Sequence, residues 1–85
     1  KLMRFGIFVI MKRQIRESVK LAVAARLREL REQKGVSQES VYIDTDLNIG
    51  RIEAAMNNLT IDTLAILCDY YGVTFEEFFR GIKTK

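Results

Sequence analysis

The side chains best suited to binding in this sequence are Lys and Arg, and they are concentrated in its first third. Residues 1–34 contain ten Lys and Arg against three Glu, a formal charge of +7, whereas residues 35–85 carry four against eight Asp and Glu, a charge of −4. Clustered cations attract phosphate groups, so a nucleic acid is one candidate partner. A plainer reading fits equally well: these side chains only solvate the outer face of a helix.

Residues that commonly carry catalysis or hold metals are scarce. The 85-residue chain has no histidine and one cysteine, Cys68, so it lacks His-based nucleophile arrangements and the usual Cys and His ligands of zinc. Its Ser, Thr, Lys and carboxylate residues follow no recognisable catalytic spacing. A single cysteine cannot close an intrachain disulfide, which fits a reducing compartment. We predict a cytoplasmic protein that is not an enzyme and has no cofactor, metal or small-molecule substrate.

Residues 5–11 form a short apolar run rich in aromatic and β-branched side chains, which predicts a β-strand. The run is far shorter than the roughly 20 residues that span a bilayer, and no signal-peptide cleavage site follows it, so we predict no membrane association. Two readings stay open. The strand pairs with its copy in a second molecule, or the segment is a disordered extension or a non-native stretch that precedes the genuine start at Met11.

The rest of the chain has helical periodicity, which predicts an all-α bundle of five helices. The predicted helices cover residues 16–34, 38–45 and 49–56, then 61–71 and a last segment from residue 75. A Ser, Asn or Thr residue precedes four of these helices as an N-cap, and a glycine follows two of them as a C-terminal stop. The caps are Ser37, Asn48, Thr60 and Thr74, and the stops are Gly35 and Gly72. In the last helix Phe75, Phe78 and Phe79 are predicted to fill the core.

The string LRELREQKGVSQE at residues 27–39 resembles the phage-repressor-like helix-turn-helix family of the Xre or Cro type. The likeness extends over about residues 19–82 and includes the later strings RIE and GVTFEEFF. This resemblance implies a helix-turn-helix DNA-binding domain at residues 15–85, preceded by an N-terminal extension at residues 1–14. In such domains the second helix lies across the DNA backbone and the third enters the major groove.

The resemblance also implies roles for individual residues. Gln38 matches a position that contacts a phosphate, while Asn48 and Arg51 are the candidates for contacts with base edges. Asn57 and Asn58 match a loop that meets a second phosphate. Arg31 and Glu53 match positions that often form a partly buried ion pair between the first and third helices. We expect that pair to be structural.

Several positions depart from the family pattern. The third helix is short by about three residues, close to one turn, and Gly50 stands where a side chain would read bases. Asp46 and Ala55 replace frequent glycines, and Tyr42 replaces an alanine. Residues 35–58 carry a local charge of −3, which opposes binding to phosphates. Affinity for DNA would then depend on the cations of the first helix and N-terminal arm: Lys12, Arg13, Arg16, Lys20, Arg26 and Arg28.

Two functions follow from these observations. The first is a transcriptional regulator that binds duplex DNA as a homodimer. The alternative is a dimeric protein-interaction module, or an antitoxin-like adaptor, that has kept the fold and lost the readout of bases. The short third helix and the acidic charge around it favour the alternative.

Overall fold

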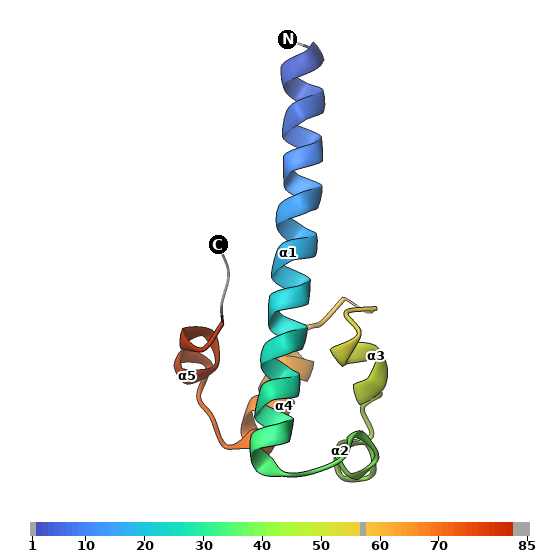
Figure 1. The fold of residues 1–85 in the computed structure, drawn as a ribbon, viewed down its shortest axis with the longest axis vertical. Helices are drawn as coiled ribbons and strands as arrows, with labels where there is room; N and C mark the ends of the chain where they lie inside the picture. Colours follow the sequence, from blue (N-terminus) through green and yellow to red (C-terminus); the bar gives the residue numbers. More distant parts are fainter. Residues whose placement is uncertain (1, 57, 83–85) are drawn as a thin grey trace.

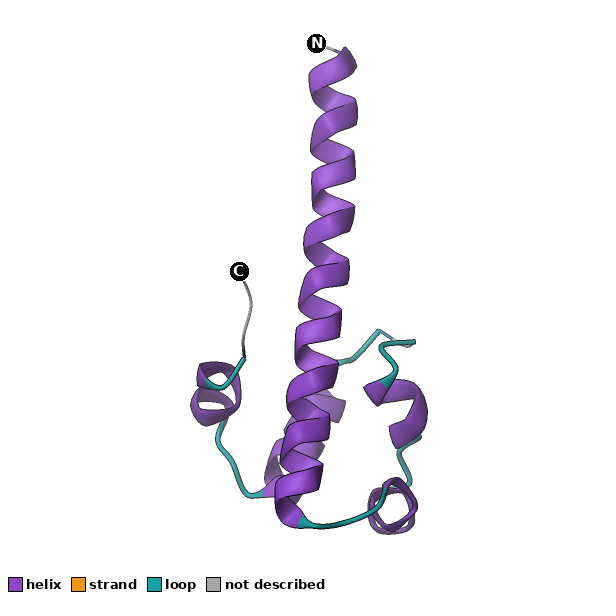
Figure 2. Ribbon diagram, in the orientation of Figure 1, coloured by secondary structure: helices purple, strands orange, loops and turns teal. Residues whose placement is uncertain are grey.

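The structure, a computed structural model, describes residues 2–56 and 58–82, with side chains from Ile10 onward. Its elements are α1 (Leu2–Lys34), α2 (Gln38–Thr45), α3 (Ile49–Glu53), α4 (Ile61–Tyr71) and α5 (Phe75–Arg80). Figures 1 and 2 show that every element in these residues is a helix, as the periodicity predicts. The long α1 forms the axis, and the four shorter helices gather around its C-terminal half.

The predicted strand at residues 5–11 is wrong, because these residues lie within α1. β-Propensity reports how well a side chain suits a paired, half-buried sheet, and residues 2–56 and 58–82 contain no second strand. Extending a helix that already exists adds one backbone hydrogen bond for each residue ordered. The helix also continues through residues 14 and 15, where we placed the domain boundary; that division stays a prediction.

The helix ends form as their capping residues predict. Ser37, Asn48, Thr60 and Thr74 each accept a hydrogen bond from the backbone amide three residues later. Gly35 lies in the left-handed region with φ +77°, and the amide of Val36 donates to the Arg31 carbonyl at 3.3 Å. This hydrogen bond is typical of the Schellman motif, in which a left-handed residue closes a helix. The caps therefore separate the elements at the predicted positions.

The core lies where α1 meets α3 and α4 and where α4 meets α5. Its most deeply buried side chains are Leu27, Val41, Leu67 and Phe78. The prediction for the aromatic stripe of α5 is only partly right, because Phe75 and Phe79 are 41% and 49% exposed. A six-residue helix packed at the edge of the bundle presents one side to its neighbours, and Phe78 occupies that side.

The N-terminal half of α1 projects beyond the bundle, and the molecule measures 50 × 23 × 19 Å (Figure 1). On this projection Ile10, Met11 and Ile15 are exposed. Among the described residues, no helix combines the length and apolar character needed to cross a membrane.

Candidate nucleic-acid interface

The connection between α2 and α3 is a tight turn of three residues, Asp46 to Asn48. Asp46 has φ +63°, and its amide donates to the Tyr42 carbonyl at 2.7 Å. Aspartate tolerates this left-handed conformation better than most residues, which explains how it replaces the usual glycine. The Thr45 hydroxyl accepts from the amide of Leu47 at 3.2 Å and donates to the Val41 carbonyl at 2.7 Å. These bonds fix the direction in which α3 leaves the turn.

The third helix is even shorter than the sequence predicts, since it ends at Glu53 and not at Met56. A Schellman motif stops it: the amide of Met56 donates to the Arg51 carbonyl at 3.0 Å, and that of Ala55 to the Ile52 carbonyl at 3.1 Å. Ala55 occupies the left-handed position with φ +58°. Only the first turn of α3 remains to present side chains outward.

Asn48 and Arg51 lie at that first turn, and both are exposed. The Oδ1 atom of Asn48 accepts the Arg51 amide at 3.2 Å and so caps the helix. Within residues 2–56 and 58–82, its NH2 group has no hydrogen-bond acceptor. The cap holds the orientation of the Asn48 side chain and leaves its NH2 group as the donor that it presents outward. Ile49, between them, is buried in the core and anchors the turn.

The ion pair between Arg31 and Glu53 forms as predicted. The Nε of Arg31 lies 2.7 Å from Oε2 of Glu53, and its Nη2 lies 3.1 Å from Oε1, a two-point contact. The two side chains are only 12% and 4% exposed. This hydrogen bond raises the pKa of the Arg31 guanidinium. The pair fastens the C-terminal end of α3 to α1, and Glu53 no longer counts as a free acidic charge near DNA.

Gln38 joins the same cluster from the first residue of α2. Its Nε2 donates to Oε1 of Glu53 at 3.0 Å, although the side chain is otherwise exposed. Arg31 also donates from Nη1 to the Val36 carbonyl at 2.9 Å, just before α2. Gln38 is therefore held beside α3, with its amide donors directed to the carboxylate and its backbone at the N-terminus of α2.

The basic residues of α1 separate into two groups. Arg26 is committed to α5, because its Nε and Nη2 donate to the carbonyls of Phe78 and Glu77, each at 3.0 Å. Arg28 pairs with Glu32 at 3.2 Å along α1. An apolar groove lies between α1, α4, α5 and the segment that connects α3 to α4. Arg16 and Lys20, one turn apart on α1, line it together with Ile52 of α3. Of the cations predicted to supply affinity, these two share a groove with Ile52 of α3, whereas Arg26 contacts α5.

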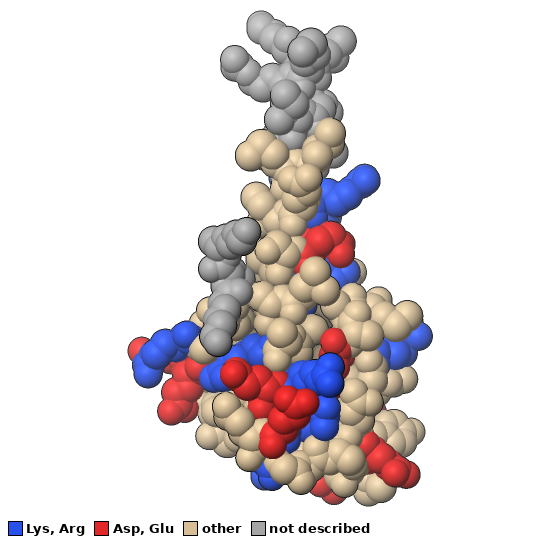
Figure 3. All heavy atoms as spheres, in the orientation of Figure 1, with Lys and Arg blue, Asp and Glu red and all other residues tan. Residues whose placement is uncertain are grey.

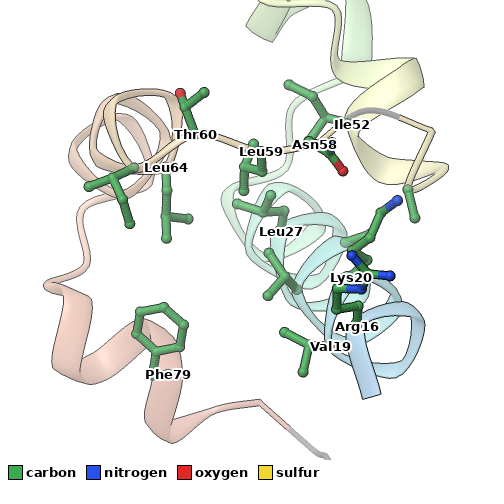
Figure 4. A pocket seen from close by; sticks show the side chains of 14 residues that line it. Arg16, Val19, Lys20, Leu27, Ile52, Asn58, Leu59, Thr60, Leu64 and Phe79 are labelled. Carbon is green, nitrogen blue, oxygen red and sulfur yellow. The ribbon is translucent and has the colours of Figure 1, made fainter. Parts of the chain in front are cut away.

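The loop after α3 is described in part. Asn57 lies outside the described residues, whereas Asn58 is exposed and borders the groove with Arg16 and Lys20. Figure 4 shows Asn58 on the segment beside α3, on the side of the groove where Arg16 and Lys20 extend from α1. The structure thus brings one predicted phosphate contact close to two cations of the first helix.

Acidic side chains remain exposed on the other side of the α2–α3 unit. Glu39, Asp44 and Asp46 are exposed, and Asp44 accepts a hydrogen bond from the Tyr70 hydroxyl at 2.6 Å. In Figure 3 one small group of acidic atoms lies at the lower right, the part of the view that α2 occupies in Figure 1. The α2 helix and the turn after it therefore carry exposed acidic charge, whereas the groove near the C-terminal end of α3 carries Arg16 and Lys20.

The hydrogen bonds that Arg26 donates to α5 were not predicted from the sequence. The side chain donates to two backbone carbonyls and pairs with Glu29 at 2.7 Å. Carbonyl acceptors carry no signature in the sequence, and the i, i+3 spacing from Arg26 to Glu29 was the sole available signal.

The short helices α2 and α3, joined by a three-residue turn, form a helix-turn-helix unit. An ion pair attaches α3 to the long helix α1, as in a helix-turn-helix domain. A scan against family models matches the Cro/C1-type HTH DNA-binding domain over residues 26–83, and this chain belongs to that family. The match confirms the family indicated by the sequence. Searches of curated proteins and of solved structures found no match.

Proposed function

We propose that this chain is a transcriptional regulator that binds duplex DNA as a homodimer. The observation that carries the proposal is the first turn of α3. Ile49 in this turn is buried and Glu53 at the other end of α3 is anchored to α1, while the polar Asn48 and Arg51 are exposed. A rigidly held helix with an exposed polar N-terminal turn suits insertion into the major groove.

Each side chain has a defined part in this proposal. The Arg51 guanidinium contacts the O6 and N7 acceptors of a guanine. Asn48 donates its NH2 group to an acceptor on a neighbouring base, since its oxygen already caps α3. Gly50 has no side chain, which lets the backbone of α3 approach the major groove of the DNA closely. Base readout is therefore confined to about two side chains per monomer, and a dimer would double it.

Contacts with phosphates make up for this limited readout. We assign them to Gln38 at the start of α2, to Asn57 and Asn58 after α3, and to Arg16 and Lys20 of α1. The last two cations extend the interface past the end of α3, away from the carboxylates of α2. In a homodimer the two α3 helices would lie about one duplex turn apart, roughly 34–36 Å.

The salt dependence of binding tests this assignment. Affinity for a random-sequence duplex, measured by fluorescence anisotropy, should fall steeply as salt rises, because each phosphate contact releases counterions. Arg16→Ala and Lys20→Ala should each reduce the slope of log K against log salt by about 1. Arg28→Ala is the matched control, since Arg28 pairs with Glu32 and does not line the groove. Binding that is absent at low salt, or a slope that the control reduces equally, would count against the proposal.

The alternative function is a protein-interaction module or antitoxin-like adaptor. The exposed carboxylates beside α3 and its single outward turn favour it. Substituting Asn48→Ala together with Arg51→Ala separates the two functions. A DNA-binding regulator should lose base preference, with each good contact worth about 1–3 kcal/mol of discrimination. An adaptor should keep its co-purified protein partner and show no duplex binding before or after the change.

A further inference from the structure

An apolar groove of about 380 Å³ lies between α1, the segment that connects α3 to α4, the start of α4, and α5. Its volume falls within the roughly 300–1,000 Å³ of small-molecule sites in proteins. Figure 4 shows side chains converging on it from several elements, among them Val19 and Leu27 of α1, Leu64 of α4 and Phe79 of α5. None of the predicted base contacts lines it.

The walls of this groove are incompletely covered by the chain itself. At its mouth Val19 is 48% exposed, Phe79 is 49% exposed and Ile61 is 70% exposed. Deeper in, Leu27 and Leu64 belong to the buried core. Covering such a surface with apolar atoms is favourable by about 25 cal/mol for each Å² removed from water. An occupant must therefore present an apolar body.

The polar groups at the edge of the groove are basic or neutral. Arg16 and Lys20 border it on α1, and Asn58 and Thr60 border it on the α3–α4 segment. Arg16 forms no ion pair within the described part of the chain, and Lys20 has only a 3.9 Å contact with Glu17, which is 63% exposed. Among the residues that the structure describes, no carboxylate lines the groove. The edge therefore favours an anionic group on the occupant.

We propose that the groove binds one molecule of an anionic amphiphile, a carboxylate or phosphate attached to an unbranched apolar chain. The head group lies between the guanidinium of Arg16 and the ammonium of Lys20. The apolar chain runs past Val19 and Val23 toward Leu64 and Phe79. The charge complementarity at the edge selects this ligand over a neutral apolar molecule of the same length.

A ligand bound in the groove would also affect DNA binding through α3, Arg16 and Lys20. This consequence rests on the proposed function. Ile52 of α3 and Ala55, two residues after the end of that helix, form part of the groove wall. Arg16 and Lys20 are the cations that we assign to phosphates of DNA, so a bound anionic head would compete with the duplex for them. The ligand would act as a negative effector of DNA binding.

Direct titration without DNA tests the groove independently of its function. In isothermal titration calorimetry on the full chain, decanoate below its micellar concentration should bind one molecule per chain. Decanol, of equal length and without charge, should bind about tenfold more weakly, because hydrogen bonds to a charged group are stronger than neutral ones. Decylamine should bind no better than decanol.

Variants locate the site. Arg16→Ala combined with Lys20→Ala should remove the preference for decanoate over decanol, while decanol binding persists. The matched control is Arg28→Ala combined with Arg80→Ala, which removes the same charge from exposed ion pairs outside the groove. Val23→Phe should weaken both ligands by filling the groove, with circular dichroism confirming that the helices remain.

Four results would overturn the proposal. They are no decanoate binding, equal affinity for decanoate and decanol, equal loss of preference in the control variant, and binding only to anionic phospholipid vesicles. The last result would mean that a lipid surface is recognised in place of a single molecule. A dimer in sedimentation that Phe79→Glu dissociates, with no decanoate taken up by the monomer, would identify a second copy as the occupant. None of these measurements contains DNA, so a failure of the ligand proposal is distinguishable from a failure of the proposed DNA-binding function.

Discussion

At the scale of single residues, Arg31 holds together the elements on which the interface depends. Its guanidinium bonds Glu53 of α3 at two points and the Val36 carbonyl before α2. Gln38 adds a further bond to the same carboxylate. A charged cluster this well shielded from water is satisfied only when all its members are present. Arg31 is accordingly a structural residue that positions α3, and it does not contact DNA in our proposal.

The first prediction concerns the cost of breaking this cluster. Arg31→Ala leaves the Glu53 carboxylate shielded and without its cation, so the free energy of unfolding should fall by about 3–5 kcal/mol. Urea denaturation followed by circular dichroism measures the change. Arg28→Ala, which breaks an exposed pair on the same helix, should cost no more than about 1 kcal/mol. Equal losses from the two variants would show that the Arg31 pair is no more stabilising than a surface pair.

Tyr71 predicts a change of stability at high pH. Burial, followed by the nearby Glu53 carboxylate, raises the pKa of the Tyr71 hydroxyl from 10.0 to about 12. A group whose pKa is higher in the folded state stabilises the fold fully below its unfolded pKa and loses that contribution as pH rises through the folded value. The wild-type chain should therefore lose stability between pH 10 and about 12.

The variant Tyr71→Phe isolates this effect, since it keeps the ring and removes the ionisable hydroxyl. Urea unfolding at pH 8, 10 and 11.5 should give a smaller loss of stability for the variant than for the wild type above pH 10. The comparison cancels the titration of Lys side chains that both chains share. Parallel curves for the two proteins over this range would be inconsistent with a shielded Tyr71 hydroxyl.

At the scale of elements, the shortness of α3 has an identifiable local cause. Three helices of this chain end in the same hydrogen-bond pattern, with Gly35, Ala55 and Gly72 at the left-handed position. Two of these residues are glycines, for which a positive φ costs little. Ala55 adopts φ +58° despite its Cβ. The stop that clips the third helix is therefore strained.

A single substitution tests this strain. Ala55→Gly relieves a left-handed penalty of roughly 1–2 kcal/mol and adds about 0.5–1 kcal/mol of chain entropy to the unfolded state. The net result should be a stabilisation of up to about 1 kcal/mol, measured by thermal and urea unfolding. Ala54→Gly, at a residue with φ −85°, has no strain to relieve and should be neutral or destabilising. Destabilisation of equal size in both variants would contradict the account.

The elements also show how far sequence reasoning reaches. Capping residues such as Ser37 and Thr74 act on backbone groups a few positions away, so the boundaries of α2 and α5 were predictable. The strand at residues 5–11 was wrong because apolar β-branched residues also suit a helix that is already growing. The stripe that contains Phe75 and Phe79 has helical spacing, but spacing alone does not reveal how much of a helix its neighbours cover.

In the candidate site, a placement was predictable from the sequence when a family motif implied it, and unpredictable when it depended on packing between distant segments. The pair Arg31 and Glu53 was predictable from the family resemblance and is confirmed. The placement of Arg26 against α5, and of Arg16 and Lys20 against α3, depends on how α1 is rotated within the bundle. Rotation is settled by packing among distant segments, which a local pattern does not encode. The roles of Gln38, Asn48, Arg51, Asn57 and Asn58 toward DNA stay predictions.

Taken as a whole, the molecule is a helical bundle whose candidate interface is built around a single outward turn, the first turn of α3. Carboxylates of α2 and of the turn after it are exposed, and cations of α1 share a groove with Ile52, near the C-terminal end of α3. A duplex placed on this face would therefore be displaced toward α1, so that Arg16, Lys20 and Asn58 share its backbone. Such an arrangement predicts weak base discrimination and a strong dependence on salt.

Amide chemical-shift mapping by NMR would locate the DNA-binding surface residue by residue. We would titrate the full chain with a short duplex at low salt and follow the backbone amides. We expect the largest shifts at the N-terminal turns of α2 and α3, at Asn58, and along α1 from Arg16 to Lys20. Shifts confined to α5 and the exposed side of α4, or no shifts at all at low salt, would contradict this expectation.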